Sequence, residues 1–244
     1  GTGAESEFAF NIPNIQNEIR QHLEDENRKD TLLLLVKEYE GAIKKYEEEK
    51  DRQFSKLSEI GRDRTSGSSQ YLKAYDQYYQ SRINLISSLM DYRFMMLENV
   101  NDQELLLIVE EALNRPRKAI RKEERLAGRS QDRLIGVFVN LNKILSRNIQ
   151  DSLKADVVRQ SLHTLETSIY AAVDETYRLS VERRNRLDDR NATREELMDM
   201  YNRSNQLRYE AARNFAILRQ DVIENTNQQE WIAINRELET FLKN

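Results

Sequence analysis

Apolar residues recur at alternating steps of three and four residues over much of this chain. The clearest series consists of Leu32, Val36, Tyr39, Ile43 and Tyr46. This spacing places the side chains along one side of an α-helix, and it is close to the heptad repeat of helices that pair lengthwise. We therefore predict one long helix over residues 31–61.

Similar spacing predicts helices over most of the remaining chain. They cover residues 15–30, 69–98, 102–113 and 132–145, a further stretch from 151, residues 193–223, and the chain from 227 onward. Only seven Gly and two Pro interrupt the sequence, and 33% of the residues are charged. Because β-rich folds need many turn residues, we predict an all-α protein.

One stretch of the sequence occurs twice. Residues 98–112 match residues 224–238 at a constant offset of 126 positions, and seven of the fifteen positions are identical. In each copy an asparagine, Asn101 or Asn227, stands three residues before a glutamate. This pattern is a variant of the capping box that opens a helix. We interpret the two copies as an internal duplication that turns the chain at both places.

The duplication suggests a domain plan. We expect a flexible N-terminus over residues 1–13, a first helical repeat over 14–114, a basic helical linker over 115–130, closed by Gly128, and a second helical repeat over 131–244. Each repeat would contain two long helices and one short helix. The predicted fold is an elongated antiparallel helical bundle made of two tandem three-helix repeats.

Basic residues gather in the predicted linker. The candidate patch for an anionic partner consists of Arg117, Lys118, Arg121, Lys122 and Arg125. Such a patch suits a lipid surface, an acidic peptide or a nucleic acid. The alternative is a solvated connector, which the shortness of the segment and its lack of aromatic residues favour. The net charge of −4 makes nucleic acid an unfavoured partner of the chain as a whole.

The residues that most enzymes and metal sites use are scarce. The chain has no Cys, and its only histidines are His22 and His163. Neither histidine has a glutamate three residues before it, as a di-iron bundle requires, and no glycine-rich nucleotide loop is present. We therefore predict a protein that is not an enzyme and that has no catalytic residue, cofactor or metal site.

Among the apolar residues, the aromatic and methionine side chains are the best candidates for binding a partner. The candidate residues for binding a partner are Tyr71, Tyr75, Tyr78, Tyr79, Met95 and Trp231. Such side chains offer a large and adaptable contact area to unfolded or amphipathic proteins. The alternative is that they pack inside the helical bundle, with the Tyr hydroxyls reaching solvent.

Membrane insertion is not expected. The longest apolar run, Leu32 to Val36, is far shorter than the roughly 20 residues that cross a bilayer. The sequence opens with Gly-Thr-Gly, as a mature secreted form or a trimmed chain would. We expect a periplasmic or secreted protein, while a cytoplasmic location and a peripheral membrane contact stay open.

The two turns also resemble a known family. Val100-Asn101-x-x-Glu104 and Thr226-Asn227-x-x-Glu230 are similar to the Leu-Thr-x-x-Gln turn of the small periplasmic helical stress proteins typified by spheroplast protein Y and the Cpx-pathway periplasmic inhibitor. Asn replaces the capping Thr, and Glu replaces Gln. The resemblance implies a cradle of long antiparallel helices that acts as a chaperone without ATP or as an envelope-stress adaptor.

Two functions follow as hypotheses. The first is a non-enzymatic periplasmic binding protein, chaperone-like or an envelope-stress adaptor, whose partners are unfolded or helical proteins. The second is a structural scaffold whose heptad-like helices pair with a second copy or with another chain.

Overall fold

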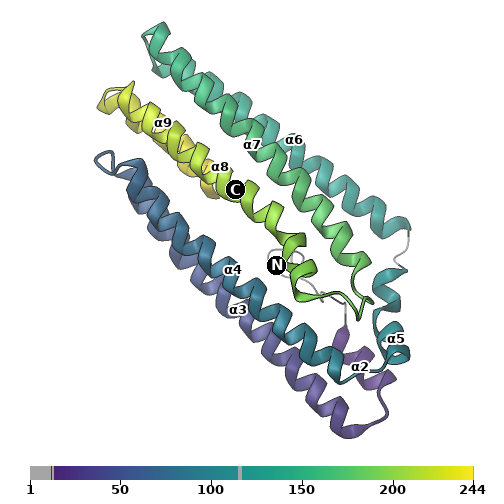
Figure 1. Ribbon diagram of the computed structural model, residues 1–244. Helices are drawn as coiled ribbons and strands as arrows, with labels where there is room; N and C mark the ends of the chain where they lie inside the picture. Colours follow the sequence, from purple (N-terminus) through teal and green to yellow (C-terminus); the bar gives the residue numbers. More distant parts are fainter. Residues whose placement is uncertain (1–11, 13, 115–116, 244) are drawn as a thin grey trace. The chain divides into compact units, whose positions relative to one another are not determined.

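The protein is built from α-helices. The computed structural model describes residue 12, residues 14–114 and residues 117–243, and every regular element within them is a helix (Figure 1). These are α2 (Ile15–His22), α3 (Glu26–Arg62), α4 (Ser68–Glu98), α5 (Asp102–Leu113), α6 (Arg117–Asn148), α7 (Ser152–Asn185), α8 (Arg194–Glu224) and α9 (Gln228–Lys243). The predicted all-α class is confirmed.

The helix boundaries show a regular spacing. The starts of α3, α4 and α5 precede those of α7, α8 and α9 by 126 residues each, and the ends of α4 and α8 differ by the same number. The predicted helix over 15–30 is interrupted, because Leu23 is extended and Asp25 accepts a hydrogen bond from the Arg28 N–H at 3.0 Å, which opens α3. The common origin of the two halves remains a prediction.

The chain divides into two compact units. Unit 1 consists of residues 1–50, 80–117 and 174–205, and unit 2 consists of residues 51–79, 118–173 and 206–244. Each unit therefore takes segments from both predicted repeats, so the units differ from the expected division at 14–114 and 131–244. Of the predicted flexible terminus, only Ile12 lies within the described residues, and it is buried.

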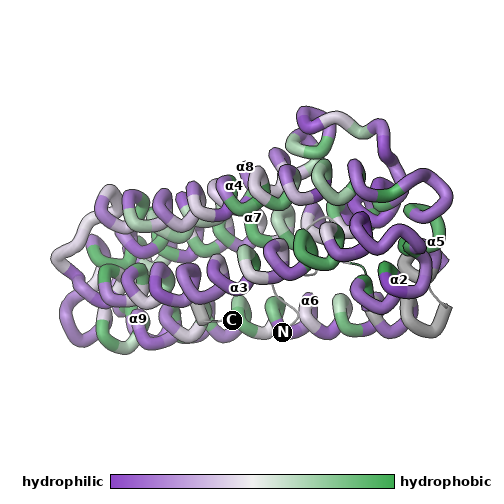
Figure 2. The backbone as a smooth tube through the Cα atoms, turned by 90° about the horizontal axis from the view of Figure 1, so that it is seen from below, coloured by the Kyte–Doolittle hydropathy of each residue, from purple (hydrophilic) through white to green (hydrophobic). Residues whose placement is uncertain are grey.

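Unit 1 has an aliphatic core. The long helices contribute Leu32, Val36 and Ile43 from α3, Leu85, Ile86, Leu89 and Met90 from α4, and Leu197 and Met200 from α8. The short helices α2 and α5 lie against each other, and Ile19 and Val109 are fully buried there. Figure 2 shows the amphipathic pattern behind this packing, since apolar and polar residues alternate along each helix.

The core of unit 2 contains more aromatic rings than the core of unit 1. Phe138, Leu141 and Leu145 of α6, Val158, Leu162 and Leu165 of α7, and Phe215 of α8 are buried in it. Figure 1 shows α6 and α7 as an antiparallel pair joined by a short loop. The ring of Phe138 lies 5.5 Å from Phe241 of α9, and Phe241 stacks at 6.0 Å on Phe215, so these rings connect three helices.

One predicted boundary is wrong. Gly128 was expected to close a separate basic linker, but α6 runs without interruption from Arg117 to Asn148. A glycine inside a helix costs only about 1 kcal/mol relative to alanine. No glycine among the described residues has a positive φ, so Gly128 does not take the conformation that ends a helix. The basic segment is therefore the first half of a long helix.

Candidate functional site

The turn between α4 and α5, in unit 1, is closed by the predicted capping box. The Glu104 N–H donates to Asn101 Oδ1 at 2.8 Å, and the Asn101 N–H donates to the Glu104 carboxylate at 2.9 Å. The turn between α8 and α9, in unit 2, has the same two bonds between Asn227 and Glu230, both at 2.9 Å. Both predicted capping boxes are confirmed.

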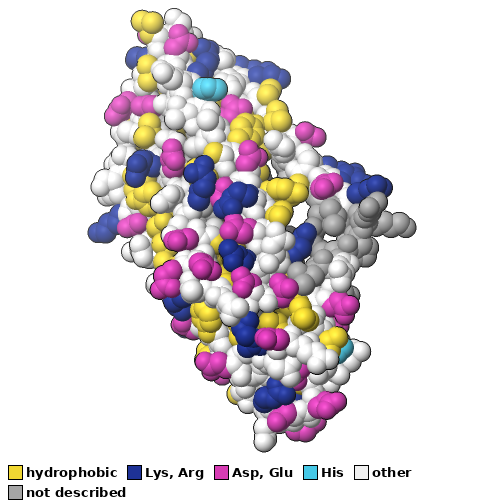
Figure 3. Space-filling view, turned by 45° about the vertical axis from the view of Figure 1, so that its right-hand side comes forward, with side chains coloured by type: hydrophobic (Ala, Val, Ile, Leu, Met, Phe, Trp, Pro, Cys, Tyr) yellow, Lys and Arg dark blue, Asp and Glu magenta, His cyan; other side chains and the backbone are white. Residues whose placement is uncertain are grey.

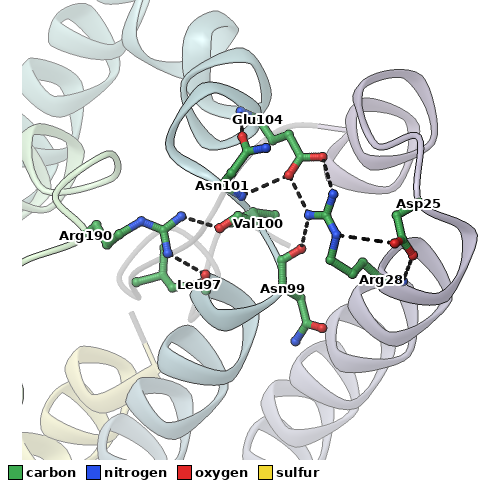
Figure 4. A network of polar contacts seen from close by, with 8 residues as sticks. All are labelled: Asp25, Arg28, Leu97, Asn99, Val100, Asn101, Glu104 and Arg190. Carbon is green, nitrogen blue, oxygen red and sulfur yellow. Dashed lines mark hydrogen bonds and ion pairs between the residues drawn. The ribbon is translucent and has the colours of Figure 1, made fainter.

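Arg28 of α3 binds the same carboxylate in unit 1. Its guanidinium donates to the two Glu104 oxygens at 2.6 and 3.0 Å and to the Asn99 carbonyl at 3.0 Å (Figure 4). This bidentate bond lowers the pKa of Glu104, and the Asn101 N–H adds to the effect, while partial burial opposes it. The first turn of α5 is thus tied to the first turn of α3.

A second arginine reaches this turn from the loop between α7 and α8. Arg190 donates to the Leu97 carbonyl at 2.6 Å and to the Val100 carbonyl (Figure 4). Its Nε also donates to Asp102 at 2.6 Å. The last carbonyls of a helix have no partner within it and carry a partial negative charge. Arg190 therefore neutralises and satisfies the end of α4.

The loop that supplies Arg190 is itself held by an arginine of α4. Arg93 is buried, and its Nη2 donates to the carbonyls of Arg186 and Asp189, both at 2.9 Å. Burial lowers the pKa of Arg93, and nearby Asp189 opposes that shift. In unit 1, therefore, the turn after α4 binds Arg190 of the α7–α8 loop, and that loop binds Arg93 of α4. We call this arrangement the reciprocal exchange.

Unit 2 repeats this exchange. Arg64, from the loop between α3 and α4, donates to the Ile223 carbonyl at 3.1 Å and to the Thr226 carbonyl. Arg219 of α8 donates in return to the last turn of α3, at the carbonyls of Ile60 (3.1 Å) and Gly61 (3.1 Å), and to the loop after it, at those of Asp63 (2.6 Å) and Ser66 (2.7 Å). The Arg219 guanidinium also lies 5.7 Å from the Trp231 ring, a cation–π contact.

We call Arg64, Arg93, Arg190 and Arg219 the turn arginines. Arg64 and Arg190 stand 126 positions apart, as do Arg93 and Arg219, and their carbonyl partners Leu97 and Ile223 are offset equally. Arg93 and Arg219 lie outside the duplicated stretch 98–112 and 224–238, so the sequence match there does not select them. Arg64 and Arg190 were missed, although the shared Asp-Arg dipeptide at the same offset is a signal for them.

An open groove lies in unit 2 between α4 and α8. Its volume is about 460 Å³, and its lining includes Asp76, Tyr79, Tyr209, Glu210 and Arg213. The rings of Tyr79 and Tyr209 are 5.1 Å apart, and the Arg213 guanidinium lies 5.5 Å from the Tyr209 ring. The groove therefore offers aromatic faces beside charges of both signs.

Most of the predicted partner-binding residues are inside the protein. Tyr71, Tyr75, Tyr78 and Trp231 are buried in unit 2, where Tyr75 packs on Tyr209 and its hydroxyl donates to the Arg208 carbonyl at 3.3 Å. Their apolar spacing therefore marks the core and not a binding surface, which corrects the prediction. Tyr79 is partly exposed in the groove, and Met95 is 38% exposed in unit 1.

The predicted basic residues all lie on α6. Arg121, Lys122 and Arg125 are exposed, while the side chains of Arg117 and Lys118 lie outside the described part. These residues belong to unit 2 except Arg117, which ends a segment of unit 1. The basic patch is therefore carried by a helix and is not a loop.

The described residues contain neither a metal-binding cluster nor a membrane-spanning helix. No group of three or more His, Asp or Glu side chains there is arranged to hold a metal ion. His22 lies 3.2 Å from Glu18 on its own helix, and His163 is exposed. No helix in these parts of the chain combines the length and the apolar character needed to cross a membrane.

Comparison with known proteins adds no assignment: no protein-family model, no curated protein and no solved structure matches this chain.

Proposed function

We propose that this protein is a non-enzymatic helical binding protein that holds protein partners on exposed apolar side chains of α7. In unit 1, Tyr177 is 54% exposed and Val181, one turn later, is 39% exposed. Single exposed apolar residues are ordinary, but an aromatic and an aliphatic side chain one helical turn apart present adjoining apolar surface. We call Tyr177 and Val181 the α7 row, and it is the observation that carries the proposal.

The surroundings of the row suit an interface. Arg178, next to Tyr177 in the sequence, pairs with Glu175 and Glu182 on the same helix, and Arg203 of α8 lies 3.5 Å from Glu175. An apolar centre with a charged rim is typical of protein interfaces, where large aromatic side chains contribute most of the affinity. Figure 3 shows this general character of the surface, with apolar side chains reaching it among charged ones.

The fold itself does not require the row. The positions 126 residues earlier, on α3, are Asp51 and Ser55, both polar. If helices of this kind needed apolar residues at these positions for packing, α3 would carry them as well. The difference supports a role for the α7 row in contacts with another protein.

A scaffold that binds a defined partner is the first candidate, because three of the four tyrosines expected to receive unfolded clients are buried. A chaperone-like role is the second candidate. It is supported by the capping boxes at Asn101 and Asn227, which occupy the positions of the Thr-x-x-Gln motif in the periplasmic family that the turns resemble. A periplasmic or secreted location is part of that second proposal.

The test compares Tyr177→Lys with Leu34→Lys in the full chain. Leu34 is 56% exposed on α3 in the same unit, so its replacement is a matched control. Self-association is measured by light scattering over a concentration series, and chaperone activity by the aggregation of a chemically reduced client protein. Loss of one aromatic anchor of about 2 kcal/mol weakens binding about 30-fold. We expect this loss for Tyr177→Lys alone.

Two results would count against the proposal. One is a wild-type protein that neither self-associates nor suppresses aggregation. The other is an equal effect of the two substitutions, because binding would then not depend on the α7 row.

A further inference from the structure

The first half of α6 differs from the other long helices in its exposure. Every described side chain from Arg121 to Arg133 is exposed, whereas Phe138, Leu141 and Leu145 of the same helix are buried in unit 2. A helix usually buries one side against its own protein. Residues 121–133 therefore present a helical segment whose described side chains all face solvent.

This segment carries a concentrated positive charge. Residues 117–133 contain seven basic and three acidic residues, in a chain whose net charge is −4. Arginine stands at every fourth position, at 117, 121, 125, 129 and 133, with Lys118 and Lys122 beside the series. Residues four apart are neighbours on a helix surface, so the described side chains of Arg121, Arg125, Arg129 and Arg133 form one ridge about 18 Å long.

The positive ridge is not neutralised within the described chain. Arg121, Lys122, Arg125, Arg129 and Arg133 take part in no ion pair or hydrogen bond among the described residues. Like charges four residues apart destabilise a helix. Some arginines elsewhere in the protein are paired with carboxylates, as Arg28 with Glu104 and Arg178 with Glu175 show. The consecutive unpaired arginines of the ridge are therefore better explained by an anion outside the chain than by the stability of α6.

We propose that the first half of α6 binds the anionic surface of a phospholipid membrane, lying along it through the basic ridge. Clusters of four to eight Lys and Arg on a helix are attracted to anionic lipids, and each basic residue increases the binding about fivefold. Insertion into the bilayer is not required, because the contact is with the headgroups. This inference is independent of the α7 row.

Two other anionic partners fit the ridge less well. Single-stranded nucleic acid is bound with aromatic side chains that stack on the bases, and residues 117–133 contain no aromatic residue. A stable protein interface needs an apolar centre from which charge is depleted, and Leu126 is the only large apolar side chain among the described residues 121–133. Binding to an anionic membrane surface requires neither aromatic residues nor an apolar centre, because it depends on the total positive charge of the helix.

The test uses vesicle cosedimentation of the full chain. The variant Arg121→Gln/Arg125→Gln/Arg129→Gln removes three charges from the ridge, and glutamine keeps a good helix propensity. The matched control, Lys37→Gln/Lys44→Gln/Lys45→Gln, removes three exposed charges from α3. Circular dichroism verifies that both variants keep their helix content.

We expect the wild type to bind phosphatidylglycerol vesicles, not to bind phosphatidylcholine vesicles, and to dissociate from the anionic vesicles in high salt. The ridge variant should bind about 100-fold more weakly, and the control within about threefold of the wild type. Equal losses in the two variants, or no binding to anionic vesicles, would overturn the proposal. Binding to duplex DNA or to polyglutamate but not to vesicles would also overturn it, and would assign the ridge to that partner.

Discussion

Replacing Arg219 by methionine removes a buried cation from the end of α3. Arg219 is 1% exposed, and its guanidinium donates to two carbonyls in the last turn of this helix and to two in the loop that follows it. A methionine side chain fills much of the same volume but donates no hydrogen bond. The substitution therefore isolates the contribution of the charged hydrogen bonds.

The free-energy cost of Arg219→Met depends on whether water can reach the four carbonyls. Gly61 and Ser66 are buried, so their oxygens would lose their partner without gaining water, whereas Asp63 is exposed and Ile60 is partly exposed. A buried polar group left without a partner costs about 1–3 kcal/mol. Burial disfavours the charged guanidinium, as the lowered pKa of Arg219 shows. Methionine avoids this desolvation cost, which offsets part of the cost of the unpaired carbonyls. We expect a loss of about 3 kcal/mol in the free energy of unfolding of unit 2.

Urea denaturation followed by tryptophan fluorescence measures this loss. Trp231 is the only tryptophan, and its ring lies 5.7 Å from the Arg219 guanidinium, so the signal reports on unit 2. Arg219→Lys keeps the charge but not the planar fork, and should cost about half as much. Arg213→Met, at an exposed position of the same helix, should cost less than about 0.5 kcal/mol. A loss for Arg219→Met no larger than that of Arg213→Met would refute the reasoning.

Two further predictions concern the capped turns. Asn101→Ala and Asn227→Ala should each reduce the free energy of unfolding by about 1 kcal/mol in urea denaturation, because each removes the acceptor of a capping box; no measurable change in either would show that the boxes do not stabilise the turns. The second prediction concerns pH, since Arg28 holds the pKa of Glu104 below its ordinary value in the folded chain. The pair therefore stabilises the fold above the pKa of an unfolded glutamate, about 4.3, and this stabilisation is lost as the pH falls through the lower folded pKa. Glu104→Gln should flatten the acid side of the stability profile, and an unchanged profile would contradict the assignment.

The features that depend on local sequence were predictable. The starts of α5 and α9 follow from Asn101 and Asn227, because a capping box is made by residues three apart. The same reasoning at Thr193 predicts the start of α8, where the Glu196 N–H donates to the Thr193 hydroxyl at 3.2 Å. Gly128 misled the prediction, because one glycine costs only about 1 kcal/mol and the good helix formers around it let α6 continue.

The features that depend on distant contacts were not predictable. Spacing shows that Tyr71 and Tyr75 share an apolar side of α4, but not that Phe215 and Tyr209, far along the chain, cover it. The turn arginines bind backbone carbonyls, which every residue has, so no partner residue type identifies them. The α7 row was not selected either, because an exposed valine and a buried one look alike in a sequence. Burial decides between them, and burial is a property of the folded chain.

Photo-crosslinking from position 177 tests the account's central claim most directly. A photoreactive phenylalanine analogue replaces Tyr177 in one variant and Asp51, its polar counterpart on α3, in another, and each full chain is irradiated alone and with a reduced client protein. The account predicts crosslinks to a second copy or to the client from position 177 and a much lower yield from position 51. Equal yields from the two positions, or none from position 177, would contradict the claim that this protein binds its partners through α7.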